Sequence, residues 1–169
     1  MKRLLFIAIC FCMALSVSAG KKKDFVDYRY ELTLAKENVA ATSGFKVFKV
    51  WSYGKKKELL TKDICMRNAV HGLLFKGLAA NDSGTQGNVR PLCPEGYQAH
   101  KEYFDRFFES GEYRQFVQFT SRGAQSAGDV IKGKKEWQVG MLVQVNLNGL
   151  RKRLEKDGII EGARNIFSR

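Results

Sequence analysis

Apolar residues occupy every second position from Trp137 to Leu147, and this stretch carries the clearest pattern in the chain. Only Leu142 breaks the alternation, while glutamine, glycine and asparagine fill most of the positions between. Strict alternation with β-branched side chains predicts a strand with one face on a core and one polar face. A buried parallel strand more often has a continuous apolar run. We therefore expect an antiparallel sheet with this strand inside it.

Three further stretches predict strands. Residues 25–34 alternate in the same way, and residues 45–53 predict a strand that is covered on both faces. Residues 113–120 are rich in tyrosine, phenylalanine and valine, which favours a strand after the break at Gly111. These strands lie on both sides of a helical middle region.

The residues before the 137–147 strand allow two structural interpretations. Val130 and Ile131 form a short apolar pair that is followed by Gly133 and two lysines. The segment is either the first arm of a hairpin or part of one long strand with a bulge at the glycine.

Helical periodicity marks three segments. The first begins after Thr61, a suitable N-cap, and ends at Gly77, a suitable C′ residue. The second covers residues 94–110, where aromatic side chains recur at helical spacing. The third follows Asn148 as its N-cap and ends at Gly158.

The resulting order is β-β-α-α-β-β-α. It predicts an α+β fold: a single antiparallel sheet of about four strands, two helices on one face and a C-terminal helix. We find no internal repeat and no linker, so residues 20–169 are expected to form a single α+β domain.

The N-terminus has the pattern of a signal peptide over residues 1–19. Lys2 and Arg3 precede an apolar run from Leu4 to Val17, and small residues allow cleavage after Ala19. The run is short for a membrane-spanning helix. We therefore expect export to the periplasm or cell envelope, or secretion, with no transmembrane segment after cleavage.

The chain is strongly basic, with a formal net charge of +12. For an exported protein the matching anions are lipid headgroups, envelope glycans and acidic proteins, whereas nucleic acid is not an expected partner. Three basic clusters supply a candidate anion-binding patch: Lys55, Lys56, Lys57, Lys132, Lys134, Lys135, Arg151, Lys152 and Arg153.

Cysteine and histidine offer few options for chemistry. After signal cleavage Cys65 and Cys93 remain, and they are expected either to form a disulfide or to be two separate buried thiols. With His71 and His100 they are the only soft ligands there, but their spacing does not match a zinc site. We find no nucleophile, phosphate-binding or dinucleotide motif. We therefore expect no enzyme activity, no metal and no cofactor.

Two segments resemble known proteins. Residues 67–79 (RNAVHGLLFKGLA) and 143–159 (VQVNLNGLRKRLEKDGI) resemble segments of small exported proteins of Bacteroidota with no assigned activity. The helix-then-strand layout is also similar to periplasmic α+β domains of curli- and flagellum-assembly proteins. These resemblances imply a non-enzymatic envelope or assembly role. We expect an exported protein-interaction or assembly module that binds an envelope protein or itself. The alternative is a binder of anionic glycan or lipid headgroups through the basic clusters.

Overall fold

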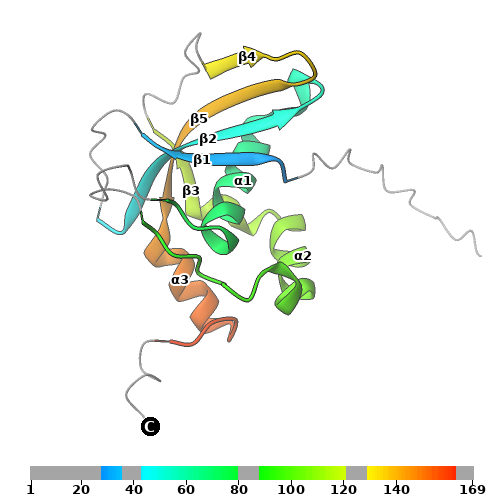
Figure 1. Cartoon of the computed structure of the whole chain (residues 1–169). Helices are drawn as coiled ribbons and strands as arrows, with labels where there is room; N and C mark the ends of the chain where they lie inside the picture. Colours follow the sequence, from blue (N-terminus) through cyan, green and yellow to red (C-terminus); the bar gives the residue numbers. More distant parts are fainter. Residues whose placement is uncertain (1–27, 36–42, 80–87, 121–128, 163–169) are drawn as a thin grey trace, which may run out of the picture.

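Two ten-residue strands, β2 (Phe45–Gly54) and β5 (Trp137–Asn146), pair antiparallel along their whole length and form the centre of the structure. Strand β1 (Tyr30–Leu34) pairs with the other edge of β2. Two short strands, β3 (Val117–Phe119) and β4 (Val130–Lys132), pair with β5. The result is one antiparallel five-stranded sheet in the order β1-β2-β5-β3, with β4 also on β5 (Figure 1).

The computed structural model describes residues 28–35, 43–79, 88–120 and 129–162. The predicted signal peptide, residues 1–19, and the first residues of the 25–34 strand lie outside these ranges. Within them, no helix has both the length and the apolar character needed to cross a membrane.

Strands β3 and β4 share the edge of β5 that β2 leaves open. Strand β3 pairs with Val143–Val145, and β4 pairs with Trp137–Val139. Strand β4 is therefore the first arm of a hairpin with β5 rather than part of one long bulged strand, and the turn is closed by a hydrogen bond of 2.8 Å from the Gly133 N–H to the Glu136 carbonyl. The sheet of the described residues has five strands, which agrees with the prediction of about four and of a possible hairpin before β5.

In the described ranges three α-helices accompany the sheet: α1 (Lys62–Phe75), α2 (Lys101–Glu109) and α3 (Leu147–Lys156). Three 3-10 helices complete the described structure: η1 (Lys57–Leu59), η2 (Tyr97–His100) and η3 (Glu112–Phe116). Helices α1 and α2 lie on one side of the sheet, and α3 continues from the end of β5 (Figure 1). The α+β class and the C-terminal helix are as the sequence predicts.

The ends of the helices confirm some predictions and correct others. Thr61 caps α1, accepting a hydrogen bond of 3.3 Å from the Ile64 N–H. Gly77 follows the helix with φ +75°, the left-handed conformation that a C′ residue needs. The cap of α3 is Asn146 instead of the predicted Asn148, because the Asn146 Oδ1 accepts from the Gly149 N–H at 2.8 Å.

Two other boundaries differ from the prediction. The second α-helix begins at Lys101 instead of residue 94, because the chain forms the 3-10 helix η2 first. Residues 113–116 belong to η3, so the strand predicted over 113–120 is reduced to β3. Both changes affect aromatic side chains that pack into the core, where burial outweighs local propensity.

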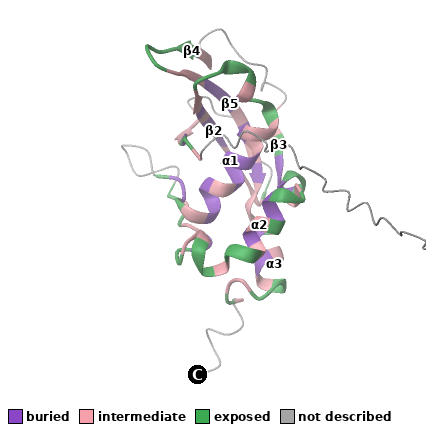
Figure 2. Ribbon diagram, turned by 90° about the vertical axis from the view of Figure 1, so that its right-hand side faces the viewer, coloured by how far each residue is buried: buried purple, intermediate pink, exposed green. Residues whose placement is uncertain are grey.

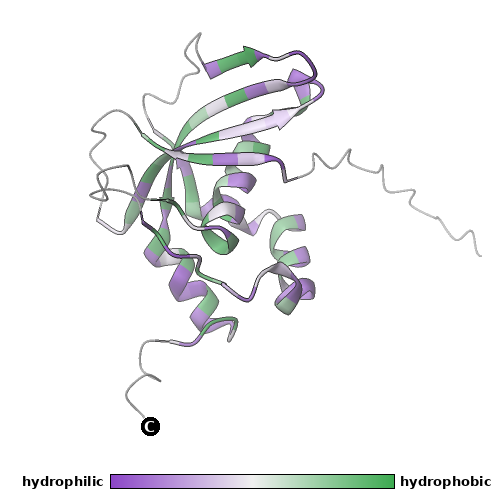
Figure 3. Ribbon diagram, in the orientation of Figure 1, coloured by the Kyte–Doolittle hydropathy of each residue, from purple (hydrophilic) through white to green (hydrophobic). Residues whose placement is uncertain are grey.

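The core lies between the helices and one face of the sheet. Strand β5 contributes Val139, Val143 and Val145, as its alternation predicts. Figure 3 shows how hydrophobic and hydrophilic positions are distributed along the strands and helices. On β2 the buried face is the one that carries Phe48 and Val50. Ser52 lies on the same buried face of β2, and its hydroxyl accepts a hydrogen bond of 3.0 Å from the Asn68 side chain of α1. This bond ties the helix to the middle of the sheet.

Candidate functional site

Two lysine clusters that are far apart in the sequence meet at one end of the sheet. Gly54, the last residue of β2, pairs with Trp137, and Lys132, the last residue of β4, pairs with Trp137 from the other side. Adjacent strands lie about 4.8 Å apart, so the two chain segments are separated by about 10 Å where they leave the sheet. We call this surface the lysine end, and it consists of Lys55, Lys56, Lys57, Lys132, Lys134 and Lys135.

The lysine end is exposed and carries a net positive charge. All six lysines are solvent-exposed, and Figure 2 shows the exposed hairpin end of β4 and β5. Residues 55–58 and 132–136 contain these six lysines and two glutamates. One of the two, Glu136, is neutralised by an ion pair of 2.6 Å with Arg29. Within the described residues, none of the six lysines forms an ion pair, so their charges are available to an external anion.

The third predicted cluster does not join this surface. Arg151, Lys152 and Arg153 lie on α3, which begins where the opposite end of β5 stops. A ten-residue strand is about 30 Å long, so the two basic regions lie at opposite ends of the sheet. Arg153 is also paired with Glu112 at 2.7 Å and with Asp157 at 2.6 Å. The nine-residue patch expected from the sequence is therefore two separate surfaces.

Cys65 and Cys93 are separate buried thiols, and the disulfide between them that was considered from the sequence is not formed. The Cys93 N–H donates to the carbonyl of Leu74 near the end of α1, whereas Cys65 lies in its first turns. Nine residues of helix separate Cys65 from Leu74, a distance of about 14 Å. A disulfide needs Cα atoms within about 7 Å, so the two elements hold these thiols too far apart.

The thiols are also poor nucleophiles. Burial raises the pKa of Cys65 to about 12, and burial together with Glu95 raises the pKa of Cys93 to about 11. The thiolate is the reactive form of cysteine, and at neutral pH both groups are thiols. Within the described residues, no group of three histidine, cysteine or acidic side chains is placed to hold a metal ion.

His71 lies in an aromatic cluster that the sequence does not reveal. Its ring stacks on Tyr28 with centroids 3.8 Å apart, and its Nδ1 is 2.7 Å from the Tyr30 hydroxyl. The pKa of His71 is lowered to about 3, chiefly by burial and then by the positive charges of Lys76 and Arg67. The histidine is therefore neutral at physiological pH and works as a packed, hydrogen-bonded side chain.

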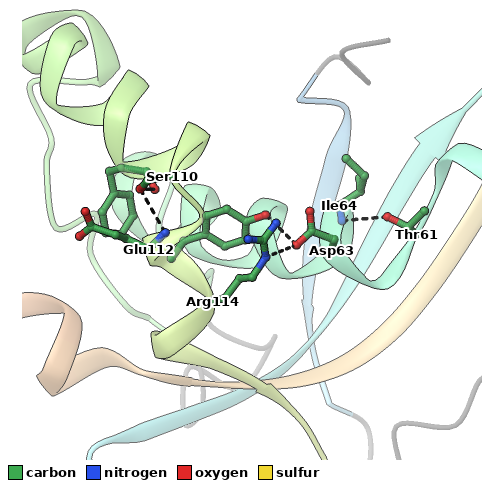
Figure 4. Close-up of polar contacts among 8 residues, drawn as sticks. Thr61, Asp63, Ile64, Ser110, Glu112 and Arg114 are labelled. Atoms are coloured by element: carbon green, nitrogen blue, oxygen red, sulfur yellow. Dashed lines mark hydrogen bonds and ion pairs between the residues drawn. The ribbon is translucent and has the colours of Figure 1, made fainter. Parts of the chain in front are cut away.

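A second feature that the sequence does not show is an interaction centre at Asp63. Its carboxylate accepts hydrogen bonds from the Tyr113 hydroxyl at 2.8 Å and from the Arg114 Nε at 2.6 Å. Figure 4 shows Arg114 directed at Asp63 beside the Thr61 cap. Because Asp63 and Arg114 are about half exposed, the ion pair adds little stability. Its effect is to fix η3 against the start of α1.

Comparison with known proteins adds no relative. No family model, curated protein or solved structure matches the chain. The resemblances to Bacteroidota, curli-assembly and flagellum-assembly proteins therefore stay expectations, and the proposals below depend on the geometry of this chain.

Proposed function

We propose that the protein is an exported, non-enzymatic binding module of the cell envelope, and that the lysine end attaches it to an anionic surface. The observation that supports this function is the meeting of two lysine clusters where β2 and β4 end and β5 begins. Their separation along the sequence means that the folded sheet, and not a run of charge, creates the concentration of positive charge.

The sheet makes this charge effective in binding. The clusters are attached to the paired ends of the strands and to a closed turn, so their backbone positions are already held before binding. Less order then has to be gained in the complex, which lowers the entropic cost of binding. Each lysine near an anionic membrane surface contributes about 1 kcal/mol, and salt screens the attraction within about 8 Å at physiological strength.

The test compares two variants that each remove two exposed positive charges. In Lys134→Ser/Lys135→Ser the charges come from the lysine end, and in Arg151→Ser/Lys152→Ser they come from the exposed side of α3. Both variants have the same net charge. Their affinity for anionic phospholipid vesicles and for immobilised heparin is measured at low and high salt.

We expect the hairpin variant to bind about 30-fold more weakly, from about 1 kcal/mol per lysine, and the α3 variant to change less than about threefold. Binding of the wild type should also fall as salt rises. Equal losses in the two variants would mean that net charge alone drives attachment, which contradicts a site at the lysine end. Absence of binding to both surfaces would also contradict the proposal.

A second candidate function is protein interaction through strand β1. Within the described residues β1 pairs on one side with β2, and its other edge has no strand beside it. Such an edge can accept an extended segment of another chain by strand addition. The test is crosslinking and pull-down from envelope fractions with the wild type and a Leu34→Pro variant. The Tyr53 N–H donates to the Arg29 carbonyl, and the alternation of an antiparallel ladder then turns the Leu34 N–H away from β2. Recovery of the same proteins with both, or of monomer alone, would exclude this edge as the contact.

A further inference from the structure

An exposed apolar side chain lies beside the lysine end. Ile131 on β4 is 43 % exposed, and it is the one large hydrophobic residue that is exposed within the described part of the chain. Single apolar residues on a surface are common and need no explanation by themselves. The position of Ile131 is the informative point, because it immediately precedes Lys132 and lies in the same hairpin as Lys134 and Lys135.

The opposite face of the same hairpin carries a tryptophan. Trp137 is half-buried and packs at the margin of the core, and the ammonium of its cross-strand partner Lys132 lies 5.5 Å from the ring centroid. Ile131 pairs with Gln138, so its side chain points to the other face of the hairpin. The hairpin therefore presents apolar groups on both faces behind a turn that contains two lysines.

This combination matches the chemistry of a membrane interface. Lysines can reach anionic headgroups while their alkyl chains and a neighbouring isoleucine enter the upper acyl region. Tryptophan is enriched at the headgroup level, where its ring is partly apolar and its N–H remains hydrogen-bonded. A soluble or cell-wall polyanion would bind the lysines, but contact with Ile131 would add little to its affinity.

We propose that the lysine end binds an anionic lipid bilayer, with Ile131 entering the interface and Trp137 at headgroup level. This inference depends on the proposed attachment to an anionic surface and names that surface. It requires no membrane-spanning segment, because the hairpin would penetrate only to the depth of its side chains.

The first experiment uses Ile131→Ser, which keeps every charge, beside the Lys134→Ser/Lys135→Ser variant. The affinity of each variant is measured for vesicles of phosphatidylglycerol in phosphatidylcholine and for immobilised heparin. We expect Ile131→Ser to weaken vesicle binding about fivefold, from the loss of part of an isoleucine's burial, and to leave heparin binding unchanged. The lysine variant should lose affinity for both surfaces.

The outcomes separate the two proposals. If Ile131→Ser affects neither surface, or both equally, the lipid inference is wrong while attachment by charge stands. Binding to heparin without binding to vesicles would overturn the lipid inference in favour of an anionic polysaccharide. If the lysine variant binds both surfaces like the wild type, the proposed function itself is wrong.

Tryptophan fluorescence gives an independent readout, because the chain has two tryptophans. In Trp51→Phe the emission comes from Trp137 alone, and it should shift to shorter wavelength on anionic vesicles and be quenched by brominated lipids. In Trp137→Phe the remaining Trp51, which lies over Gly140 in the middle of the sheet, should not respond. An unchanged Trp137 emission on bound vesicles would overturn the inference. Should Trp51→Phe fail to fold, brominated-lipid quenching of the wild type, compared with Trp137→Phe, supplies the same measurement.

Discussion

The half-buried His71 makes the stability of the fold depend on pH. Its pKa in the folded protein is about 3, against an ordinary value of 6.5, because burial and the charges of Lys76 and Arg67 disfavour the protonated ring. The unfolded chain takes up a proton below pH 6.5 that the folded chain does not. Above pH 6.5, the pKa of the unfolded state, the free energy of unfolding is therefore unaffected by this histidine. As the pH falls from 6.5 towards 3, the free energy of unfolding decreases.

The size of this effect follows from the two pKa values. With 6.5 in the unfolded state and about 3 in the folded state, the free energy of unfolding falls by about 2 kcal/mol at pH 5 and about 3 kcal/mol at pH 4. The acids Asp105 and Asp157, whose pKa values are lowered by hydrogen bonds, act in the same direction. A variant is therefore needed to isolate the histidine.

The variant is His71→Phe, and its control is Tyr30→Phe. Replacing the imidazole with a ring that cannot titrate should reduce the loss of stability between about pH 8 and about pH 4 by about 3 kcal/mol. Tyr30→Phe removes the hydrogen bond to His71, which costs about 1 kcal/mol, but keeps the half-buried histidine and its pH dependence. Urea unfolding at a series of pH values measures both effects.

Parallel stability profiles for the wild type and His71→Phe would refute this reasoning, since the histidine would then titrate alike in the folded and unfolded states. If Tyr30→Phe also removed the pH dependence, the hydrogen bond rather than burial would be its cause.

Three further predictions concern glycines and thiols. Gly140→Ala should cost about 1–3 kcal/mol, because its Cβ would lie 2.8 Å from the Trp51 ring, and adding Trp51→Leu should restore part of the loss. Gly77→Ala should destabilise more than Gly158→Ala in thermal unfolding: both have positive φ, but only at Gly77 would the Cβ lie 2.2 Å from the Val89 carbonyl oxygen. Ellman's reagent should modify the two buried thiols only after denaturation; rapid modification of the native protein would contradict their burial.

The α+β class could be predicted because its main elements have regular local signals. The alternation in β5 is long enough to identify both its secondary structure and its buried face. Thr61 and Gly77 mark the ends of α1 by the conformations and hydrogen bonds that helix ends require. In these places local preference and tertiary packing agree.

The errors occur where packing overrides a short local signal. Residues 113–116 have a strand-forming composition. They nevertheless form the 3-10 helix η3, which places the side chains of Tyr113 and Phe116 in the core. Asn146 and Asn148 are both good caps by residue type, and the length of β5 decides between them. A single sequence therefore indicates neither the 3-10 helix at 113–116 nor which asparagine caps α3.

For a related reason, the sequence predicts the basic clusters of the candidate site but not which of them lie together. Each basic cluster is evident from composition, but which clusters meet depends on strand register, and register is a long-range property. The pairing of Trp137 with both Gly54 and Lys132 brings two clusters together. The separate position of α3 excludes the third.

This arrangement also determines how the molecule would sit on an anionic surface. The lysine end has no ion pairs within the described residues, whereas on α3 Arg153 is paired with Glu112 and Asp157. The attraction is therefore stronger at the lysine end, although both regions are basic. Because β5 separates the two by about 30 Å, several Debye lengths, α3 would contribute little once the lysine end is bound. The bound protein would stand with β4 towards the surface and α3 away from it, which leaves the edge of β1 accessible to a second partner.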